Sequence, residues 1–441
     1  MTPTSPPWRG RRSWRPMTAL LLAVICSVCT TNAAKVSSKS TATPSPKHSH
    51  SQTMTQAQMS SMTGHDAADI RLVLEQTLGH HAILMIRLMR GPFDKEPGFV
   101  AAADGALARN TDELVAAVSS VYGKSAGSAF RTLWVEHVNA LKAYSEALAN
   151  GDDSAKKKAM DTLDAYAAKY GAAVSKLTHG RLPAAAVSKG VAEHIHHIIA
   201  ATDAYAAKDY VEAFAMERMA YAGMFSTGKA LAGAATAGSS GELPAGFDNP
   251  PAQLRSALGR LLGEHVELAF DATRAVVSGN PSADAAAKAL NGNTQDIITA
   301  MRSVLGASAA AKFSAVWAGH IDALVSFAVA VADKDAAAQS AARTRLDKFP
   351  GQLGDVLPSV SHGAVSAKTV IDALHEHDQQ LLQQVTSYAA GDYATSHEIA
   401  YEGYLHMHDI AATLADVLEG RAAGDSPRGG AATGGGWLAR R

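Results

Sequence analysis

The sequence predicts an all-α protein made of two tandem four-helix-type antiparallel bundles, and three observations support this fold class. Hydrophobic residues make up 47% of the 441 residues, with alanine prominent and aromatics at only 6%, a mix that favours helices over sheets. Apolar residues recur at helical spacing between short breaks. The chain also matches itself at an offset of about 183 residues, which indicates an internal duplication.

The first residues are typical of an export signal. Several arginines precede Met17–Cys29, an apolar stretch of signal-peptide length that is too short to span a bilayer. Small residues follow, so we expect cleavage after Ala33 or Ala34 and a secreted or extracytoplasmic protein. The Arg11-Arg12 pair is similar to a twin-arginine signal, but any basic leader can contain such a pair.

Composition limits the chemistry of the mature chain. Both cysteines, Cys26 and Cys29, lie inside the expected signal, so a metal site would have to use His, Met, carboxylate or backbone ligands. The formal net charge of -1 argues against a nucleic-acid or anionic-membrane partner. No transmembrane span is expected, and the sequence identifies no protein partner.

Changes in composition set the predicted domain boundaries. They are a signal peptide at 1–34, a disordered linker at 35–66, a first helical bundle at 67–236, a linker at 237–250, a second bundle at 251–420 and a disordered Gly-rich tail at 421–441. The 35–66 linker contains His48, His50, Met54, Met59 and Met62. Imidazole and thioether together suit copper, although a plain polar linker explains the same residues.

The duplication rests on specific matched residues. Phe130, Trp134 and His137 match Phe313, Trp317 and His320 at an offset of 183. Near the start of each unit the offset is 184, as between His81 and His265, so a one-residue indel separates the two registers. Further matched pairs are Asn110 with Asn293, His194 with His377, Tyr205 with Tyr388, and Tyr221 with Tyr404.

Each unit is predicted to be helical throughout. In the first, a helix should run from Ala67 to Met89 and end at Gly91-Pro92. A helical pair is expected over 99–122, with Asn110 or Thr111 as the N-cap of its second member. Further helices are predicted over 125–149, 154–177 and 183–207, and a last one from the Asp209 cap to 232. Short turns between long helices favour an antiparallel bundle.

Histidines lie near the middle of several of these helices. Residues at equal height in an antiparallel bundle can converge, because neighbouring helix axes lie only about 8–10 Å apart. Neutral imidazole is a common ligand for zinc and copper. The sequence therefore predicts a copper or zinc ion in each bundle, with these candidate ligands: His81, His137 and His194 in the first, and His265, His320, His377 and His406 in the second.

The first unit departs from this pattern at one position. Gly223 stands where the second unit has His406, so a fourth ligand there would have to come from His80, His196 or His197. Each histidine also has a plainer interpretation, because a histidine on an apolar helix face is commonly a core residue with a satisfied hydrogen bond. Trp134 and Trp317 each lie three residues before a histidine and could pack against it, but they are interpreted as core residues.

No catalytic motif accompanies the histidines. The sequence contains no Gly-rich phosphate loop, GxSxG elbow or HExxH zinc-protease motif, and Glu193 and Glu376 directly precede His, unlike the Glu-x-x-His of di-iron bundles. A binding protein is therefore favoured over an enzyme. Two alternatives remain open: a structural or surface interaction module with core histidines, and a haem carrier with two axial histidines.

The second unit resembles a known group of proteins. The pattern Leu262-Gly263-Glu264-His265, Trp317-x-x-His320, Glu376-His377 and Tyr404-x-His406-Met407 resembles secreted, duplicated all-helical proteins of Gram-positive bacteria, some associated with copper amine oxidase N-terminal-like domains. The resemblance covers both units and implies an exported, helical and duplicated protein. It implies no particular activity.

Overall fold

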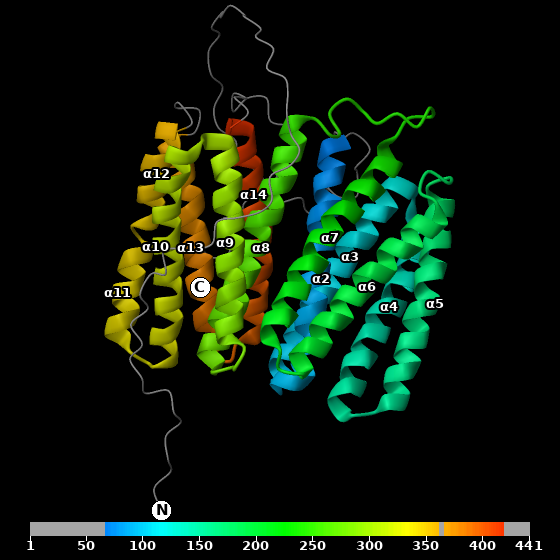
Figure 1. The fold of residues 1–441 in the computed structure, drawn as a ribbon, viewed down its shortest axis with the longest axis horizontal. Helices are drawn as coiled ribbons and strands as arrows, with labels where there is room; N and C mark the ends of the chain where they lie inside the picture. Colours follow the sequence, from blue (N-terminus) through cyan, green and yellow to red (C-terminus); the bar gives the residue numbers. More distant parts are fainter. Residues whose placement is uncertain (1–66, 361–365, 419–441) are drawn as a thin grey trace, which may run out of the picture. The chain divides into compact units, whose positions relative to one another are not determined.

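The computed structural model describes residues 67–360 and 366–418, all within one compact unit. These residues form helices joined by short turns, with no strand among them, so the all-α class is confirmed. The first half (67–236) contains α2 (Ala67–Asp94), α3 (Pro97–Tyr122), α4 (Lys124–Asn150), α5 (Asp153–Leu177), α6 (Ala184–Ala206) and α7 (Tyr210–Thr236). The second half begins at Pro250, and Figure 1 shows its helices beside those of the first.

The second half follows a similar order of helices. Its helices are α8 (Pro250–Ser278), α9 (Ala283–Leu305), α10 (Ala307–Ala332), α11 (Ala336–Leu346), α12 (Phe349–Val360), α13 (Ala367–Ala389) and α14 (Tyr393–Leu418). The pair α11 and α12 stands where the first half has the single helix α5. Pro350, the second residue of α12, explains the split, because proline has no N–H to donate to the preceding turn and its ring clashes with that turn. Ala167 occupies the matched position of α5.

Side-chain caps fix where several helices begin. The Asp209 carboxylate accepts a hydrogen bond from the backbone N–H of Glu212, as predicted. The Asn249 side chain accepts one from Ala252 at the start of α8. Each such cap is worth about 1 kcal/mol.

Two local predictions were wrong. Helix α2 does not end at Gly91-Pro92 but continues to Asp94, since a proline in the last turn removes few internal hydrogen bonds. The expected helical pair over 99–122 is one continuous helix, α3. Asn110 lies in its interior rather than at a cap, and its side-chain amide donates to the backbone carbonyl of Thr77 on α2.

The two halves are joined by buried ion pairs. The Arg87 guanidinium lies 2.6 Å from Glu267 and 3.0 Å from Asp271 of α8. Arg90 lies 3.2 Å from Asp271 and 2.5 Å from Glu217 of α7. All of these side chains are buried, so each charge depends on its partners in place of water. Helices α2 and α8 therefore form the centre of the contact between the halves, with α7 against α9 and α14 against α3 beside it.

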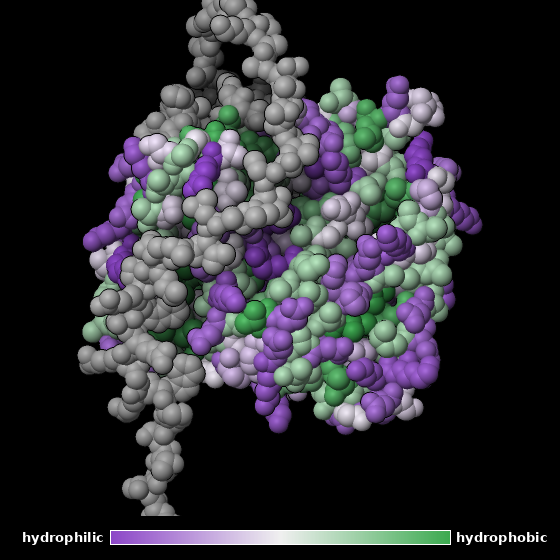
Figure 2. All heavy atoms as spheres, in the orientation of Figure 1, coloured by the Kyte–Doolittle hydropathy of each residue, from purple (hydrophilic) through white to green (hydrophobic). Residues whose placement is uncertain are grey.

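One helix in the described part of the chain, α10, is long and apolar enough to cross a membrane. This criterion uses only length and composition, and the core helix of a soluble protein can meet it. Trp317, His320 and Phe327 of α10 are buried among the other helices of the second half. The face drawn in Figure 2 mixes hydrophilic and hydrophobic residues over both halves.

Candidate metal centres

Three helices of the first half bring one histidine each to a common point. His81 of α2, His137 of α4 and His194 of α6 each offer a ring nitrogen, and these three nitrogens all lie within 4.8 Å of one another. The Nε2 atoms of His81 and His137 are 3.3 Å apart. All three side chains are buried, with His81 completely inaccessible to solvent. We call this group the first triad.

The second half contains a corresponding second triad. His265 of α8, His320 of α10 and His377 of α13 again offer three ring nitrogens that lie within 4.8 Å of one another. The ring centroids are 5.7 to 6.0 Å apart, and all three side chains are at most 1% exposed. These positions match the first triad residue by residue in the sequence comparison.

Burial keeps the six imidazoles uncharged. It lowers the pKa of His137 to about 3 and that of His194 to about 4, with a smaller contribution from neighbouring histidines. Burial lowers the pKa of His265 to about 3. The pKa values of His81, His320 and His377 are lowered well below the usual range for the same two reasons. At neutral pH each ring therefore carries a free lone pair, the form that binds metals.

The ring nitrogens have few protein partners. Within residues 67–360 and 366–418, neither nitrogen of His194, His265, His320 or His377 has a hydrogen bond, although all are shielded from solvent. Buried polar atoms in native proteins are nearly always satisfied, and leaving one unpaired costs about 1–3 kcal/mol. In each triad the unpaired nitrogens converge on one point. A metal ion bound at that point would satisfy them.

The spacing of the nitrogens suits a transition metal. Tetrahedral zinc with Zn–N bonds of about 2.0–2.1 Å places two ligating nitrogens roughly 3.3 Å apart. The Nε2 atoms of His81 and His137 have this separation. The three ring nitrogens of the first triad already lie within 4.8 Å of one another. A small rotation of the His194 ring would bring all three to about this spacing.

Aromatic side chains enclose both triads. Trp134 lies 4.5 Å, between ring centroids, from both His81 and His137, and Tyr166 of α5 stacks on His137 at 4.9 Å. In the second half Trp317 lies 4.8 Å from His265, and Phe349 stacks on His320 at 4.2 Å. These rings restrict the imidazoles and keep water away from them. Both tryptophans are buried core residues, as predicted, and both also pack against the histidines.

The remaining predicted histidines lie elsewhere. His406 of α14 is buried, but its Nε2 is 2.9 Å from the backbone carbonyl of Ala373 and it is not one of the three grouped residues. His80, considered as a substitute ligand in the first half, lies 3.1 Å from Glu267 and stacks on Tyr404. His196 is exposed and His197 partly exposed on α6.

Sequence reasoning missed one neighbour of the second triad. Asp378 of α13 places a carboxylate oxygen 3.2 Å from Nδ1 of His320, without the alignment of a hydrogen bond. The residue is 4% exposed, and burial raises the pKa of its carboxyl to about 8. In the sequence Asp378 directly follows a candidate ligand, and Ile195 stands at the matched position of the first half, but this difference alone does not indicate a contact with His320.

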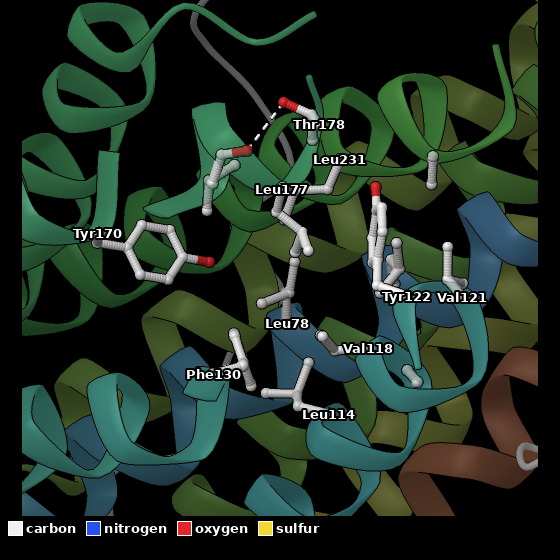
Figure 3. A pocket seen from close by; sticks show the side chains of 14 residues that line it. Leu78, Leu114, Val118, Val121, Tyr122, Phe130, Tyr170, Leu177, Thr178 and Leu231 are labelled. Carbon is white, nitrogen blue, oxygen red and sulfur yellow. Dashed lines mark hydrogen bonds between the residues drawn. The ribbon is translucent and has the colours of Figure 1, made fainter. Parts of the chain in front are cut away.

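A small apolar cavity of about 50 Å³ lies in the first half (Figure 3). Its wall includes Leu78, Leu114, Val118 and Phe130. The hydroxyl of Thr178, also in the wall, already donates to the carbonyl of Val174. Its lining is apolar apart from the hydroxyls of Tyr122, Tyr170 and Thr178, so it lacks the charged groups of a polar ligand site.

The fold and the two triads define an all-helical protein with paired, buried histidine sites. No protein-family model, curated protein or solved structure matches the chain significantly. Functional inference therefore rests on the geometry of the sites.

Proposed function

We propose that this protein is an exported metal-binding protein that holds one copper or zinc ion at each histidine triad. The observation that carries the proposal is the convergence, twice, of three neutral and buried imidazoles, most of whose nitrogens have no hydrogen-bond partner among the described residues. The Nε2 atoms of His81 and His137 contact only each other. A core histidine with a purely structural role normally has a hydrogen-bond partner for at least one nitrogen. Most nitrogens of these triads have none.

The donor set favours copper or zinc over harder cations. Imidazole is a borderline ligand that suits zinc, copper, iron and nickel, whereas calcium and magnesium require oxygen ligands. Three histidines also leave one coordination position for a further ligand on a tetrahedral ion. Retention of the ion by a buried, three-helix site fits storage or transfer of the metal better than transient surface binding.

A haem carrier fits the geometry less well. An axial pair needs an extended apolar slot between two histidines to admit the porphyrin. In each triad the third histidine lies within 4.8 Å of the other two and occupies this space. A structural module without a ligand would have to tolerate several unsatisfied buried nitrogens, which costs stability.

Export and duplication belong to the same proposal. The basic residues before Met17–Cys29 support export, and this segment lies outside the described residues. The matched histidines and the matched asparagines support duplication: Asn110 donates to the carbonyl of Thr77, and Asn293 donates to that of Leu261. Mass spectrometry of the secreted protein tests export, with a mature N-terminus expected at Ala34 or Lys35.

Elemental analysis tests the metal proposal. The mature chain, without an affinity tag, is stripped with a chelator, loaded with Zn²⁺ or Cu⁺ and desalted. We expect two ions per chain, and one ion in each of the variants His137→Ala and His320→Ala. The His196→Ala variant is the control, because this exposed residue lies on α6 but outside the triad. A wild-type chain that retains no metal above background would overturn the proposal.

The His/Met-containing linker requires a second control. His48 and His50 lie outside the described residues and could bind copper independently of the triads. A variant with both replaced by alanine should still retain two ions. If its metal content falls to zero, the linker and not the triads holds the metal.

A further inference from the structure

The two triads differ in one charged neighbour. Asp378 lies 3.2 Å from Nδ1 of His320, whereas the matched position in the first half is the buried, apolar Ile195. The first-half counterpart of His320 is His137, whose Nε2 is turned toward His81. If His320 uses the same nitrogen toward its triad, its Nδ1 is left to face the carboxylate.

A carboxylate beside the second ring nitrogen is typical of metal-binding histidines, and rotation of the Asp378 carboxyl at this 3.2 Å separation would align the hydrogen bond. A ligating imidazole usually donates its other N–H to a carboxylate or carbonyl, which fixes the tautomer and makes the ligand more basic. Once a bound cation favours loss of its proton, Asp378 would add one negative charge beside a site made otherwise of neutral ligands. A divalent ion would thus be better compensated in the second triad than in the first.

The Asp378 side chain has no evident structural role. Both of its carboxylate oxygens are buried, and neither has a hydrogen bond to any residue that the structure describes. A buried carboxylate without partners is unfavourable for folding, so its presence beside a histidine triad requires another explanation. Positioning a metal ligand provides one.

We infer that Asp378 is a positioning residue that makes the second triad the tighter of two non-equivalent metal sites. The inference rests on the proposed function, since it concerns the relative affinity of the same two sites. Loss of such a carboxylate partner typically weakens metal binding 10- to 100-fold. The wild-type chain should therefore show two classes of Zn²⁺ site, with the weaker class in the first half.

Competition titration with a zinc-binding dye tests this inference on the full mature chain. Asp378→Asn should weaken the tight class roughly 10- to 100-fold and leave the other class unchanged. His320→Ala should remove the tight class, and His137→Ala the weak class. Asp409→Asn is the matched control, because Asp409 is another carboxyl of the second half whose pKa burial raises, to about 7. It should leave both affinities within about threefold.

A second measurement separates positioning from a structural role. Asp378→Asn should leave the unfolding temperature of the metal-free protein nearly unchanged, because the carboxyl that it replaces makes no hydrogen bond among the described residues, while it weakens metal binding. A structural residue would lower the unfolding temperature instead. With Co²⁺ as the probe, Asp378→Asn should also shift the visible absorption of the second site. Asp378→Glu should bind Zn²⁺ at this site more tightly than Asp378→Asn does.

The outcomes distinguish this inference from the proposed function. If the wild-type chain binds no Zn²⁺, the proposed function fails. If it binds two ions and Asp378→Asn leaves both affinities within threefold, the triads are metal sites but the role of Asp378 is refuted. Equal affinity of the two wild-type sites would also refute it.

Discussion

The hydroxyl of Tyr221 lies 3.3 Å from the hydroxyl of Tyr404, and the two tyrosines occupy matched positions, 183 residues apart, in the two halves of the chain. Both rings are fully buried where the halves meet. The Tyr404 hydroxyl donates to the backbone carbonyl of Gln76, 2.9 Å away. Because a hydroxyl has a single proton, Tyr221 must donate to Tyr404.

This direction of donation predicts unequal effects of two conservative substitutions. Tyr404→Phe leaves the Tyr221 hydroxyl without an acceptor and should destabilise the protein by about 1–3 kcal/mol. Tyr221→Phe leaves only an acceptor unpaired and should cost less, about 1 kcal/mol. Chemical denaturation of the two metal-free variants compares them. A larger loss for Tyr221→Phe would reverse the assigned direction.

Gly79 of α2 lets the ring of Tyr221 pack closely against the backbone of this helix. A Cβ atom at Gly79 would lie 2.8 Å from the Phe225 ring and 2.9 Å from the Tyr221 ring, closer than carbon atoms can pack. We expect Gly79→Ala to destabilise the protein by about 1–3 kcal/mol through overpacking. Gly319→Ala is the control, since nothing lies within 4 Å of its added methyl. It should stabilise α10 by about 0.5–1 kcal/mol, and thermal unfolding measures both effects.

The buried ion pairs should contribute far more to the free energy of unfolding than the exposed ion pairs do. Arg87→Met leaves Glu267 and Asp271 with less compensation in the interior, and breaking a buried pair costs about 3–5 kcal/mol. Arg131→Met removes the exposed pair with Asp112 and should cost under about 1 kcal/mol. Urea denaturation measures the difference. Similar losses for the two variants would show that the interface charges do not hold the halves together.

Acid should destabilise the metal-free protein through its buried histidines. The pKa values of His137 and His265 are lowered to about 3, so the native state binds fewer protons than the unfolded state, in which histidine titrates near pH 6.5. Their contribution is present above about pH 6.5 and is lost as the pH falls toward 3. Between these limits each histidine adds about 1.4 kcal/mol per pH unit to the slope of stability against pH.

Replacing the histidines isolates this contribution from that of the carboxyls. The raised pKa of Glu217, about 7, gives an opposite slope as the pH rises from 4.5 to 7. The comparison is therefore between wild type and the double variant His137→Gln, His265→Gln. The variant should lose a slope of about 1.4 kcal/mol per pH unit for each histidine replaced. An unchanged slope would mean that these imidazoles titrate normally in the native state.

Helical periodicity and the internal match predicted much of the fold and of the site. Apolar spacing located the helices, and equal height along them placed His81, His137 and His194 together before any coordinates. The same reasoning selected His406, whose Nε2 contacts the carbonyl of Ala373. Height along a helix does not determine the direction in which a side chain points, because adjacent residues are rotated by about 100° about the helix axis. His406 therefore has a suitable height but contacts a backbone carbonyl.

Other features depend on tertiary contacts that a single sequence does not display. Asn110 resembles an N-cap locally, yet its amide serves a neighbouring helix. The pairing of Arg87 with Asp271 is not evident in sequence, because the partners lie 184 residues apart on helices whose docking the pattern left open. Asp378 was overlooked because a lone acidic residue after a histidine carries no distinctive spacing.

X-ray absorption spectroscopy at the zinc edge tests the central claim most directly. On the chelator-stripped mature chain reloaded with two equivalents of Zn²⁺, the account predicts a first shell that includes three nitrogens at about 2.0–2.1 Å, with the outer-shell scattering of imidazole rings. Replacing His137 and His320 together should abolish this imidazole signal. A first shell of oxygen ligands alone, or a spectrum unchanged by that double substitution, would contradict metal binding by the two triads.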